Sequence, residues 1–178
     1  MSKKVLVLSG SPRRGGNSDL LCDQFMIGAK EAGHQAEKIF LRDKKINYCV
    51  GCYACKGRGN CAQQDDMAEV LEKMIAVDSI VMATPVYFYT MDAQMKTLID
   101  RTVSRYTEIR NKEMYFIVSA ADTRKQAMER TIEGFRGFTS CLSEAKEKGI
   151  IYGTGAWDVG DVKGQPAMKQ AYEMGKNV

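Results

Sequence analysis

Residues 4–18 decide the fold, and they read Lys4-Val5-Leu6-Val7-Leu8-Ser9-Gly10-Ser11-Pro12-Arg13-Arg14-Gly15-Gly16-Asn17-Ser18. The apolar run Lys4–Ser9 has the composition of a buried parallel strand. A loop rich in glycine and serine follows, and Asn17–Gly33 then has the capping residues and the closing glycine of a helix. A strand, a glycine-rich loop and a helix in this order predict the first unit of a sheet with helices on both faces.

The rest of the chain continues this alternation. Further strands are predicted at Gln35–Leu41, Ser79–Thr84, Met114–Ser119 and Gly149–Gly153. Helices are predicted at Asp65–Val77, Thr90–Tyr106, Thr123–Lys148 (with a break near Gly134–Gly137) and Ala167–Lys176. We therefore expect one α/β domain over residues 1–178, a flavodoxin-like doubly wound sheet of five parallel strands in the order 2-1-3-4-5.

The composition narrows the class of protein. The chain has 178 residues, of which 44% are hydrophobic and 27% charged, as in an ordinary globular domain. The net charge of +4 comes without a basic run or a basic patch with interleaved aromatics, so we expect no nucleic-acid partner. There is no signal peptide and no apolar run of membrane-spanning length, which makes a cytoplasmic location without membrane association the expectation.

The loop Ser9–Ser18 offers the groups that bind a phosphate monoester. Free backbone N–H groups and the positive end of the following helix meet where the strand ends. Ser11, Asn17 and Ser18 add side-chain donors, and Arg13 or Arg14 adds positive charge. The alternative is a glycine-, serine- and proline-rich turn that binds no ligand.

The details of this loop limit which phosphate it suits. Gly10-x4-Gly15 half-matches the loop that binds nucleoside triphosphates, but Gly16-Asn17 follows in place of Lys-Ser/Thr. The dinucleotide fingerprint G-x-G-x-x-G, with an acid at the end of the second strand, is also missing. What remains is a terminal phosphate held without Mg²⁺, and FMN fits that description.

Two more loops are expected at the same edge of the sheet, because ligands of doubly wound sheets bind at the carboxyl ends of the strands. Thr84–Thr90 contains three consecutive aromatic residues, which suit contact with a flat heteroaromatic ring. A hydrophobic dimer surface is the alternative use of these rings. Ser119–Thr123 has small residues that allow a ring system to approach closely.

Four cysteines lie within thirteen residues, with the spacing C-x2-C-x2-C-x5-C, at Cys49, Cys52, Cys55 and Cys61. Four uses remain open: a [4Fe–4S] cluster, a zinc ion, free or transiently oxidised thiols, and packing of a glycine-rich loop. This segment, 49–61, is a cysteine-rich insertion after the second strand, so we expect it at the ligand-binding edge. Cys22 and Cys141 are expected to be buried, inert thiols.

Catalysis by side chains has little support in the sequence. His34 is the only histidine, which excludes a Ser-His-Asp triad and a histidine-rich metal site. We expect no catalytic acid or base. Trp157 is expected to anchor the core or an interface, with a position over a bound ligand as the alternative.

The loops together resemble a known family. Ser9–Ser18, Thr84-Pro85-Val86-Tyr87 with the following Ala93-Gln94-Met95-Lys96, and Ile99-Asp100-Arg101 are similar to the flavodoxin-like NADPH-dependent FMN reductase superfamily. The cysteine spacing resembles that of its iron–sulfur flavoprotein branch.

This resemblance implies the cofactors and their ligands. The FMN phosphate would contact Ser9, Ser11, Arg13, Asn17 and Ser18, and the isoalloxazine would contact Pro85, Val86, Tyr87, Phe88, Ser119 and Asp122. In the cluster-bearing branch, Cys49, Cys52, Cys55 and Cys61 would hold a [4Fe–4S] centre. A homodimer or homotetramer is also implied.

The predicted function is that of an FMN-dependent oxidoreductase. NAD(P)H would donate a hydride to FMN, and an acceptor such as a quinone, a nitro compound, a flavin or the cluster would take the electrons. One alternative is an iron–sulfur flavoprotein that carries electrons between protein partners without oxidising NAD(P)H. Another is a module without redox chemistry that binds a small ligand or a partner.

Overall fold

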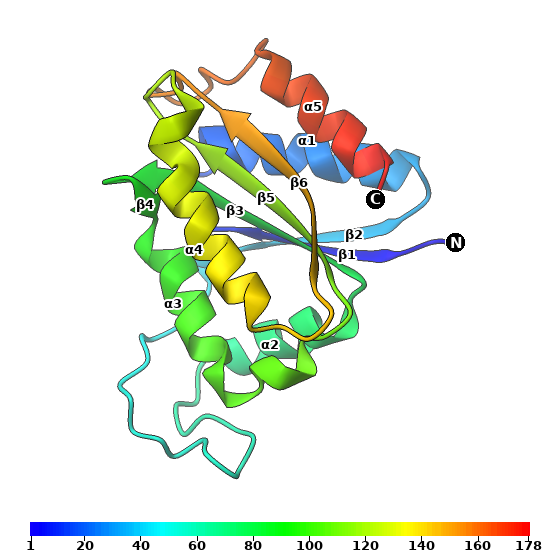
Figure 1. Cartoon of the computed structure of the whole chain (residues 1–178). Coiled ribbons are helices and arrows are strands. Elements are labelled where there is room, and N and C mark those ends of the chain that lie inside the picture. Colours follow the sequence, from blue (N-terminus) through cyan, green and yellow to red (C-terminus); the bar gives the residue numbers. More distant parts are fainter.

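The computed structural model describes all 178 residues, and its strands form a parallel sheet (Figure 1). The strand order is β2-β1-β3-β5-β6, and the two-residue β4 pairs antiparallel with β3. The strands are β1 (Lys4–Ser9), β2 (Gln35–Phe40), β3 (Ser79–Tyr87), β4 (Thr90–Met91), β5 (Glu113–Ser119) and β6 (Lys146–Gly153). Counted without β4, this is the predicted order 2-1-3-4-5, so the predicted fold is confirmed.

Five α-helices connect the strands or follow them. They are α1 (Asn17–Glu31), α2 (Met67–Ala76), α3 (Ala93–Arg101), α4 (Glu129–Ser140) and α5 (Pro166–Lys176). The predicted break near Gly134–Gly137 is wrong, because α4 runs without interruption through both glycines. Buried Ile132, Phe135 and Phe138 hold its apolar stripe on the sheet, which outweighs the low helix propensity of glycine. No helix combines the length and apolar character that crossing a membrane requires.

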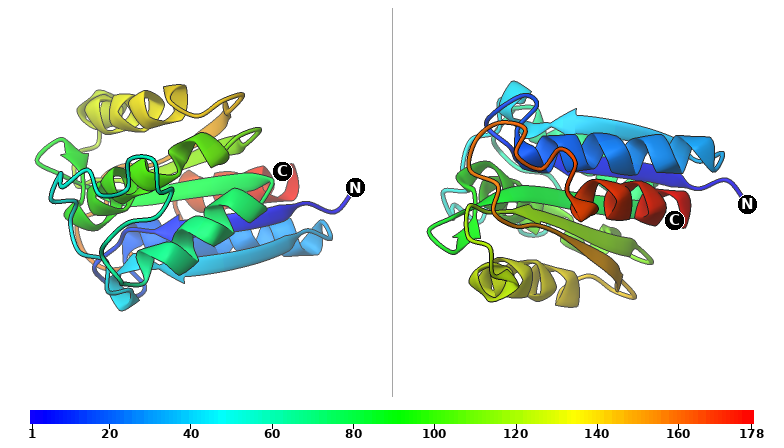
Figure 2. Two further views of the ribbon diagram at one scale, coloured as in Figure 1. Left: turned by 90° about the horizontal axis from the view of Figure 1, so that it is seen from below. Right: turned by 90° about the horizontal axis from the view of Figure 1, so that it is seen from above.

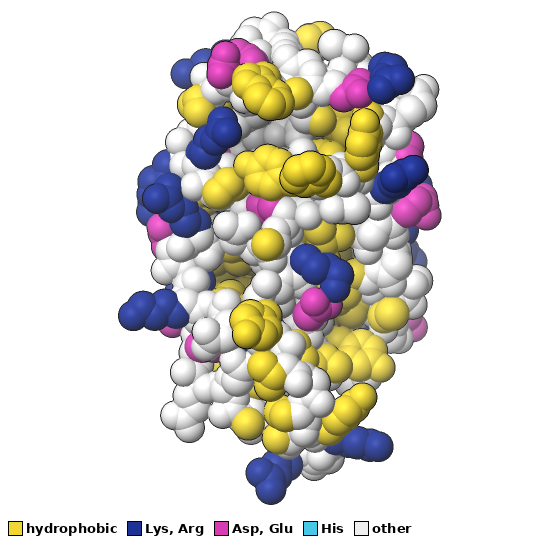
Figure 3. Space-filling view, turned by 90° about the vertical axis from the view of Figure 1, so that its left-hand side faces the viewer, with side chains coloured by type: hydrophobic (Ala, Val, Ile, Leu, Met, Phe, Trp, Pro, Cys, Tyr) yellow, Lys and Arg dark blue, Asp and Glu magenta, His cyan; other side chains and the backbone are white.

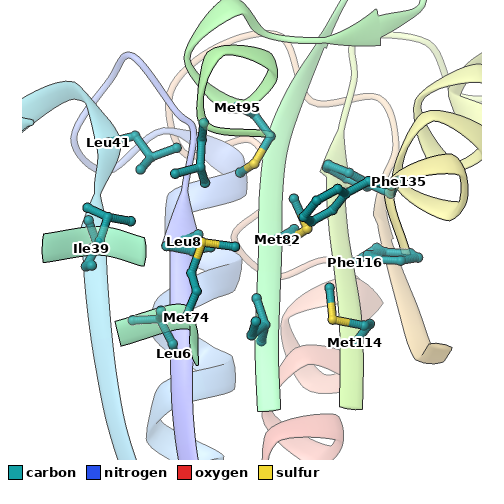
Figure 4. Close-up of a cluster of buried hydrophobic side chains, with 14 of the residues drawn as sticks. Leu6, Leu8, Ile39, Leu41, Met74, Met82, Met95, Met114, Phe116 and Phe135 are labelled. Atoms are coloured by element: carbon teal, nitrogen blue, oxygen red, sulfur yellow. The ribbon is translucent and has the colours of Figure 1, made fainter. Parts of the chain in front are cut away.

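Helices cover both faces of the sheet (Figure 2). Side chains of β1 alternate between two hydrophobic cores, as the two-residue period of a strand requires. Val5 and Val7 pack in the core beneath α1 and α5, whereas Leu6 and Leu8 pack in the core beneath α2, α3 and α4. Figure 4 shows the second core, where methionines from α2, α3, β3 and β5 lie among leucine and phenylalanine side chains. With both faces covered, the ends of the strands are the open parts of the sheet.

The helices α1 and α5 touch backbone to backbone. A Cβ added at Gly28 would lie 2.0 Å from the Tyr172 carbonyl oxygen, and one at Gly175 would lie 2.0 Å from the Phe25 carbonyl oxygen. Any larger residue at either position must therefore push the helices apart. This contact seats the C-terminal helix against the first helix of the fold.

We predict that Gly28→Ala lowers the free energy of unfolding by at least about 2 kcal/mol, because the clash is with backbone atoms that cannot rotate away. Gly137→Ala is the matched control, since Gly137 also lies within a helix but has nothing within 4 Å of an added Cβ. That control should stabilise the protein by about 0.5–1 kcal/mol. Urea unfolding of both variants measures the difference, and equal stabilities would contradict the close contact.

Candidate functional site

A cavity of about 840 Å³ lies at the carboxyl ends of the parallel strands. Its wall is built by the loops that follow β1, β3, β5 and β6, together with the first turn of α3. Figure 3 views the molecule from this edge, where exposed hydrophobic side chains gather among lysines and arginines. The volume falls within the usual range of small-molecule sites, roughly 300–1,000 Å³.

The loop after β1 presents donors without partners. The N-cap of α1 is Gly16, so no side chain caps the first turn of the helix. The Ser18 hydroxyl is buried and has no hydrogen-bond partner. Arg13 lines the cavity and makes no ion pair. An uncapped helix N-terminus, a buried free hydroxyl and a free guanidinium are groups that can stabilise an anion.

Ser9 lies beneath this loop and does not line the cavity. Its hydroxyl donates a hydrogen bond to Asp19 Oδ1 at 3.0 Å. The Asp19 carboxylate also accepts from the Gly15 N–H at 3.0 Å and from Lys38 Nζ at 2.8 Å. The buried Asp19 therefore holds the strand end and the loop in one shape, and Ser9 supports the cradle from below.

Asn17 lines the cavity, but its side chain is already bonded to the loop after β6. The Asn17 amide donates to the Asp158 carbonyl at 2.8 Å. Its oxygen accepts from the N–H groups of Gly160 and Val162 at 3.1 and 3.2 Å. In the structure the Asn17 side chain joins the two loops. Its predicted role, donating a hydrogen bond to a phosphate, competes with these bonds.

The aromatic loop after β3 forms the opposite wall. Pro85, Val86, Tyr87 and Phe88 all line the cavity. Phe88 and Tyr89 have φ angles of 48° and 66°, a conformation that residues other than glycine rarely adopt. These angles turn the chain tightly from β3 into β4 and leave Phe88 fully exposed.

The loop after β5 contributes its small residues. Ser119, Ala120 and Ala121 line the cavity, but Asp122 does not. The Asp122 carboxylate instead accepts from the backbone and side chain of Arg124, and these hydrogen bonds lower its pKa to about 2. The Asp122 side chain is therefore already paired with Arg124 and does not reach the cavity.

Two cavity residues come from the tail of the chain. Trp157 and Val159 line the cavity from the loop after β6 and are 75% and 59% exposed. Trp157 does not belong to the core, so that part of its prediction is wrong. The rule that ligand-binding loops follow the carboxyl ends of strands would have placed both residues here.

The cavity also contains a buried carboxyl group that the sequence argument missed. Asp92 is 1% exposed and is the N-cap of α3, where Oδ1 accepts from the Met95 N–H at 2.9 Å. Its Oδ2 atom is buried and has no partner. Burial raises the pKa of Asp92 to about 7, although the hydrogen bonds at Met95 and Thr84 act in the opposite direction. An aspartate before an amphipathic helix is an N-cap signal, but the helix was predicted to begin earlier, at Thr90.

The cysteine-rich segment lies in the long loop between β2 and α2. A buried ion pair closes the base of this loop: Arg101 bonds both carboxylate oxygens of Asp65, at 2.7 and 2.9 Å. Arg101 also donates to the Asn47 carbonyl at 2.5 Å and lies 3.5 Å from Cys61 Sγ. Burial alone would raise the pKa of Asp65, but the hydrogen bonds from Arg101, Asn47 and Met67 lower it. No local sequence pattern indicates this pair, because its partners are 36 residues apart.

The cysteines do not form a metal site in this structure. No three histidine, cysteine, aspartate or glutamate side chains lie close enough together to hold a metal ion. Cys49 and Cys52 are exposed, and Cys55 and Cys61 are half-buried. The segment follows the carboxyl end of β2, as expected, but none of the four cysteines lines the cavity. The loop is fixed to the C-terminal end of the nine-residue α3, roughly 13 Å from its cavity end.

The two remaining cysteines differ from each other. Cys22 is fully buried, as predicted, and burial raises the pKa of its thiol. Cys141 is exposed at the end of α4, so the prediction that it is buried is wrong. It is the C-cap of α4 and lies outside the apolar stripe, which continues from Phe138 to Leu142.

Comparisons with solved structures agree with the observed fold. The FMN-dependent NADH-azoreductase of Bacillus anthracis, solved in complex with FMN, superposes with a TM-score of 0.75 over 98% of each chain, at 17% identity. At this identity the similarity shows the fold alone.

Sequence comparisons identify the family. An iron–sulfur flavoprotein of Methanocaldococcus jannaschii is 39% identical over 137 residues, which cover 76% of this chain and 70% of the relative. An iron–sulfur flavoprotein of Archaeoglobus fulgidus is 41% identical over 98 residues, which cover 55% of this chain but only 44% of the relative. The family model for NADPH-dependent FMN reductases matches residues 3–139, and the chain therefore belongs to this family.

Proposed function

We propose that the chain binds FMN and acts as an NAD(P)H-dependent oxidoreductase that reduces a small acceptor such as a quinone, a nitro compound or a flavin. One observation carries the proposal: the cavity has an anion cradle at one end and aromatic and small residues at the other. A flavin mononucleotide has the matching pair of ends, a phosphate and a flat ring. Membership of the FMN reductase family supports the same ligand.

The residues present fit this cofactor. The buried Ser18 hydroxyl lacks a partner, and a phosphate oxygen would supply one. A Cβ added at Gly16 would lie 2.7 Å from Ser11 Oγ and would crowd the loop. Because glycine has no side chain, the backbone here can approach the phosphate closely. Ser11, Arg13, Asn17 and Ser18 would hold the phosphate, with Ser9 beneath them. Pro85, Val86, Tyr87, Phe88 and Ser119 would contact the ring, and Asp122 would reach it only after leaving Arg124.

FMN would supply the hydride chemistry, because flavins exchange hydrides with nicotinamides and electrons with many acceptors. The residues of the chain would bind and orient it. Arg13 and the N-terminus of α1 would balance the charge of the phosphate. Ala120 and Ala121, with their short side chains, would leave room for a second flat molecule, either the nicotinamide or the acceptor.

The walls of the cavity contain few groups that could move a proton. Its ionisable side chains are Arg13, Asp92 and Lys96, besides the phenol of Tyr87. Hydride transfer requires no side-chain acid or base. The protein would therefore contribute binding, orientation and exclusion of water rather than a catalytic residue.

Removing the free donors of the cradle should weaken FMN binding. Ser18→Ala and Arg13→Ala should each raise the Kd by about 10- to 100-fold, because a hydrogen bond to a charged group contributes about 1.5–3 kcal/mol. Quenching of flavin fluorescence measures the Kd. Arg14→Ala is the control, since Arg14 pairs with Asp43 on the surface and does not line the cavity. A loss of affinity in the control as large as in the other two would contradict the assignment.

NADPH or NADH added without oxygen should bleach the absorption of the bound flavin within seconds. That outcome distinguishes the enzyme from an electron carrier, which would be bleached only by a reduced protein partner. A purified chain that takes up no FMN would rule out both functions. Stopped-flow absorbance with each nicotinamide also gives the preference for NADH or NADPH.

The cluster requires a change in the cysteine-rich loop. Its four thiols are donors of the right kind, but their present arrangement does not fit a metal centre. Metal sites commonly form only when the metal binds. Gly51, Gly57 and Gly59 all have positive φ angles and give the loop the tight turns that closing around a metal needs. We propose that a [4Fe–4S] centre on Cys49, Cys52, Cys55 and Cys61 would form in this way.

Anaerobic incubation with iron and sulfide should then load about four iron atoms per chain. Cys52→Ser should lose most of this iron, whereas Cys141→Ser should retain it, because Cys141 lies on α4 and outside the loop. Iron and labile-sulfide analysis after gel filtration checks both variants. Retention of zinc alone, or of no metal, would exclude the cluster while leaving the FMN proposal untouched.

A further inference from the structure

Asp92 is the one buried carboxyl group at the cavity without a charged partner. Its Oδ1 accepts the Met95 N–H, and its own N–H donates to Thr84 Oγ1 at 3.0 Å. Oδ2 has no partner and almost no exposure to solvent. A buried carboxylate oxygen without a hydrogen bond is costly, so the site favours either the protonated group or a ligand that completes it.

The carboxyl group lies where the two ligand loops meet. Gly10 begins the loop after β1, and its missing Cβ would lie 2.8 Å from Asp92 Oδ1 and 3.1 Å from Oδ2. Thr84, which binds the Asp92 N–H, begins the loop after β3. A ligand with its phosphate at Ser18 and its ring at Pro85 must cross this junction. Asp92 lines the cavity at this junction.

No charged group on the surrounding elements neutralises this carboxyl. The charged residues that share the cavity wall are Arg13, on the loop after β1, and Lys96, on α3. Lys96 pairs with Asp100 at 2.6 Å, and neither cation bonds to Asp92. The contacts from β3 and from the start of the first loop are neutral. Burial thus dominates, and it raises the pKa of Asp92 to about 7.

We propose that Asp92 is a positioning residue for the flavin nucleotide: in the complex it holds a proton and donates a hydrogen bond to the chain between phosphate and ring. This inference rests on the proposed FMN site. The negative charge of FMN further favours the protonated carboxyl. A protein molecule whose Asp92 is ionised therefore takes up one proton from solvent when it binds FMN. The affinity for FMN is then linked to pH through a group that touches no acceptor and no nicotinamide.

The direction of the linkage follows from the protonation of the free protein. Below about pH 7, Asp92 already carries its proton and the Kd is independent of this group. Above about pH 7, the free protein is ionised and the Kd rises by roughly tenfold per pH unit. The phosphate of FMN, with its second pKa near 6, is already a dianion there and contributes little.

The test is a fluorescence titration of the full chain with FMN between pH 7 and pH 9. Wild-type protein should lose up to about 100-fold in affinity over this range. Asp92→Asn keeps an oxygen that caps α3 and an N–H that can donate, but it cannot ionise. Its Kd should stay within about threefold across the same range, so that at pH 9 the variant binds FMN more tightly than the wild type. Asp92→Ser keeps the cap but lacks the second polar atom, and it should bind more weakly than Asp92→Asn at every pH.

A wild-type Kd that does not change, or an Asp92→Asn variant with the same slope as the wild type, would overturn the inference. Calorimetry of the wild type in two buffers with different ionisation enthalpies counts the protons taken up and needs no variant, so a variant that fails to fold leaves the test intact. Uptake near one proton at pH 8.5 is expected, and no uptake would contradict the proposal. Absence of FMN binding by the wild type at every pH would instead overturn the proposed function.

Discussion

The hydrogen bond from the Gly10 N–H to the Ala83 carbonyl, 2.8 Å long, is the contact on which the site depends. It ties the end of β1 to β3 at the point where their loops separate to form the two main walls of the cavity. A doubly wound sheet opens a crevice at such a point, because the connections on its two sides lead to opposite faces. Gly10 is required here, since a Cβ would come within 3.0 Å of the Ala83 carbonyl and collide with Asp92.

Parallel strands covered on both faces leave the molecule few places to bind a ligand. The two cores bury the faces of the sheet, so polar groups collect at the carboxyl ends, where the loops begin. Asp19 and Asn17 then use side-chain hydrogen bonds to fix the first loop from below and to join it to the loop after β6. Asp19 therefore shapes the loop without lining the cavity itself.

The cysteine-rich loop depends on a different interaction. Arg101 and Asp65 form a buried, bidentate ion pair that joins the base of the loop to the far end of α3. Removing one partner of such a pair leaves a buried charge, which costs about 3–5 kcal/mol. The helix α3 thus meets the cavity at Asp92 and the cysteine loop at Arg101, and its length keeps the two sites apart.

The sequence by itself determined the five main strands, their order and three of the four loops of the cavity, because apolar runs and glycine-rich turns are local signals. The predicted start of α3, at Thr90, was too early. The turn into β4 needs positive φ angles at Phe88 and Tyr89, and aromatic residues do not indicate such angles. Only the tertiary structure decided that Asn17 bonds Gly160, that Asp92 is buried without a charged partner and that the cysteines lie away from the cavity. Each of these facts depends on contacts between residues far apart in the chain or on burial by several elements at once. A local sequence pattern contains no information on either.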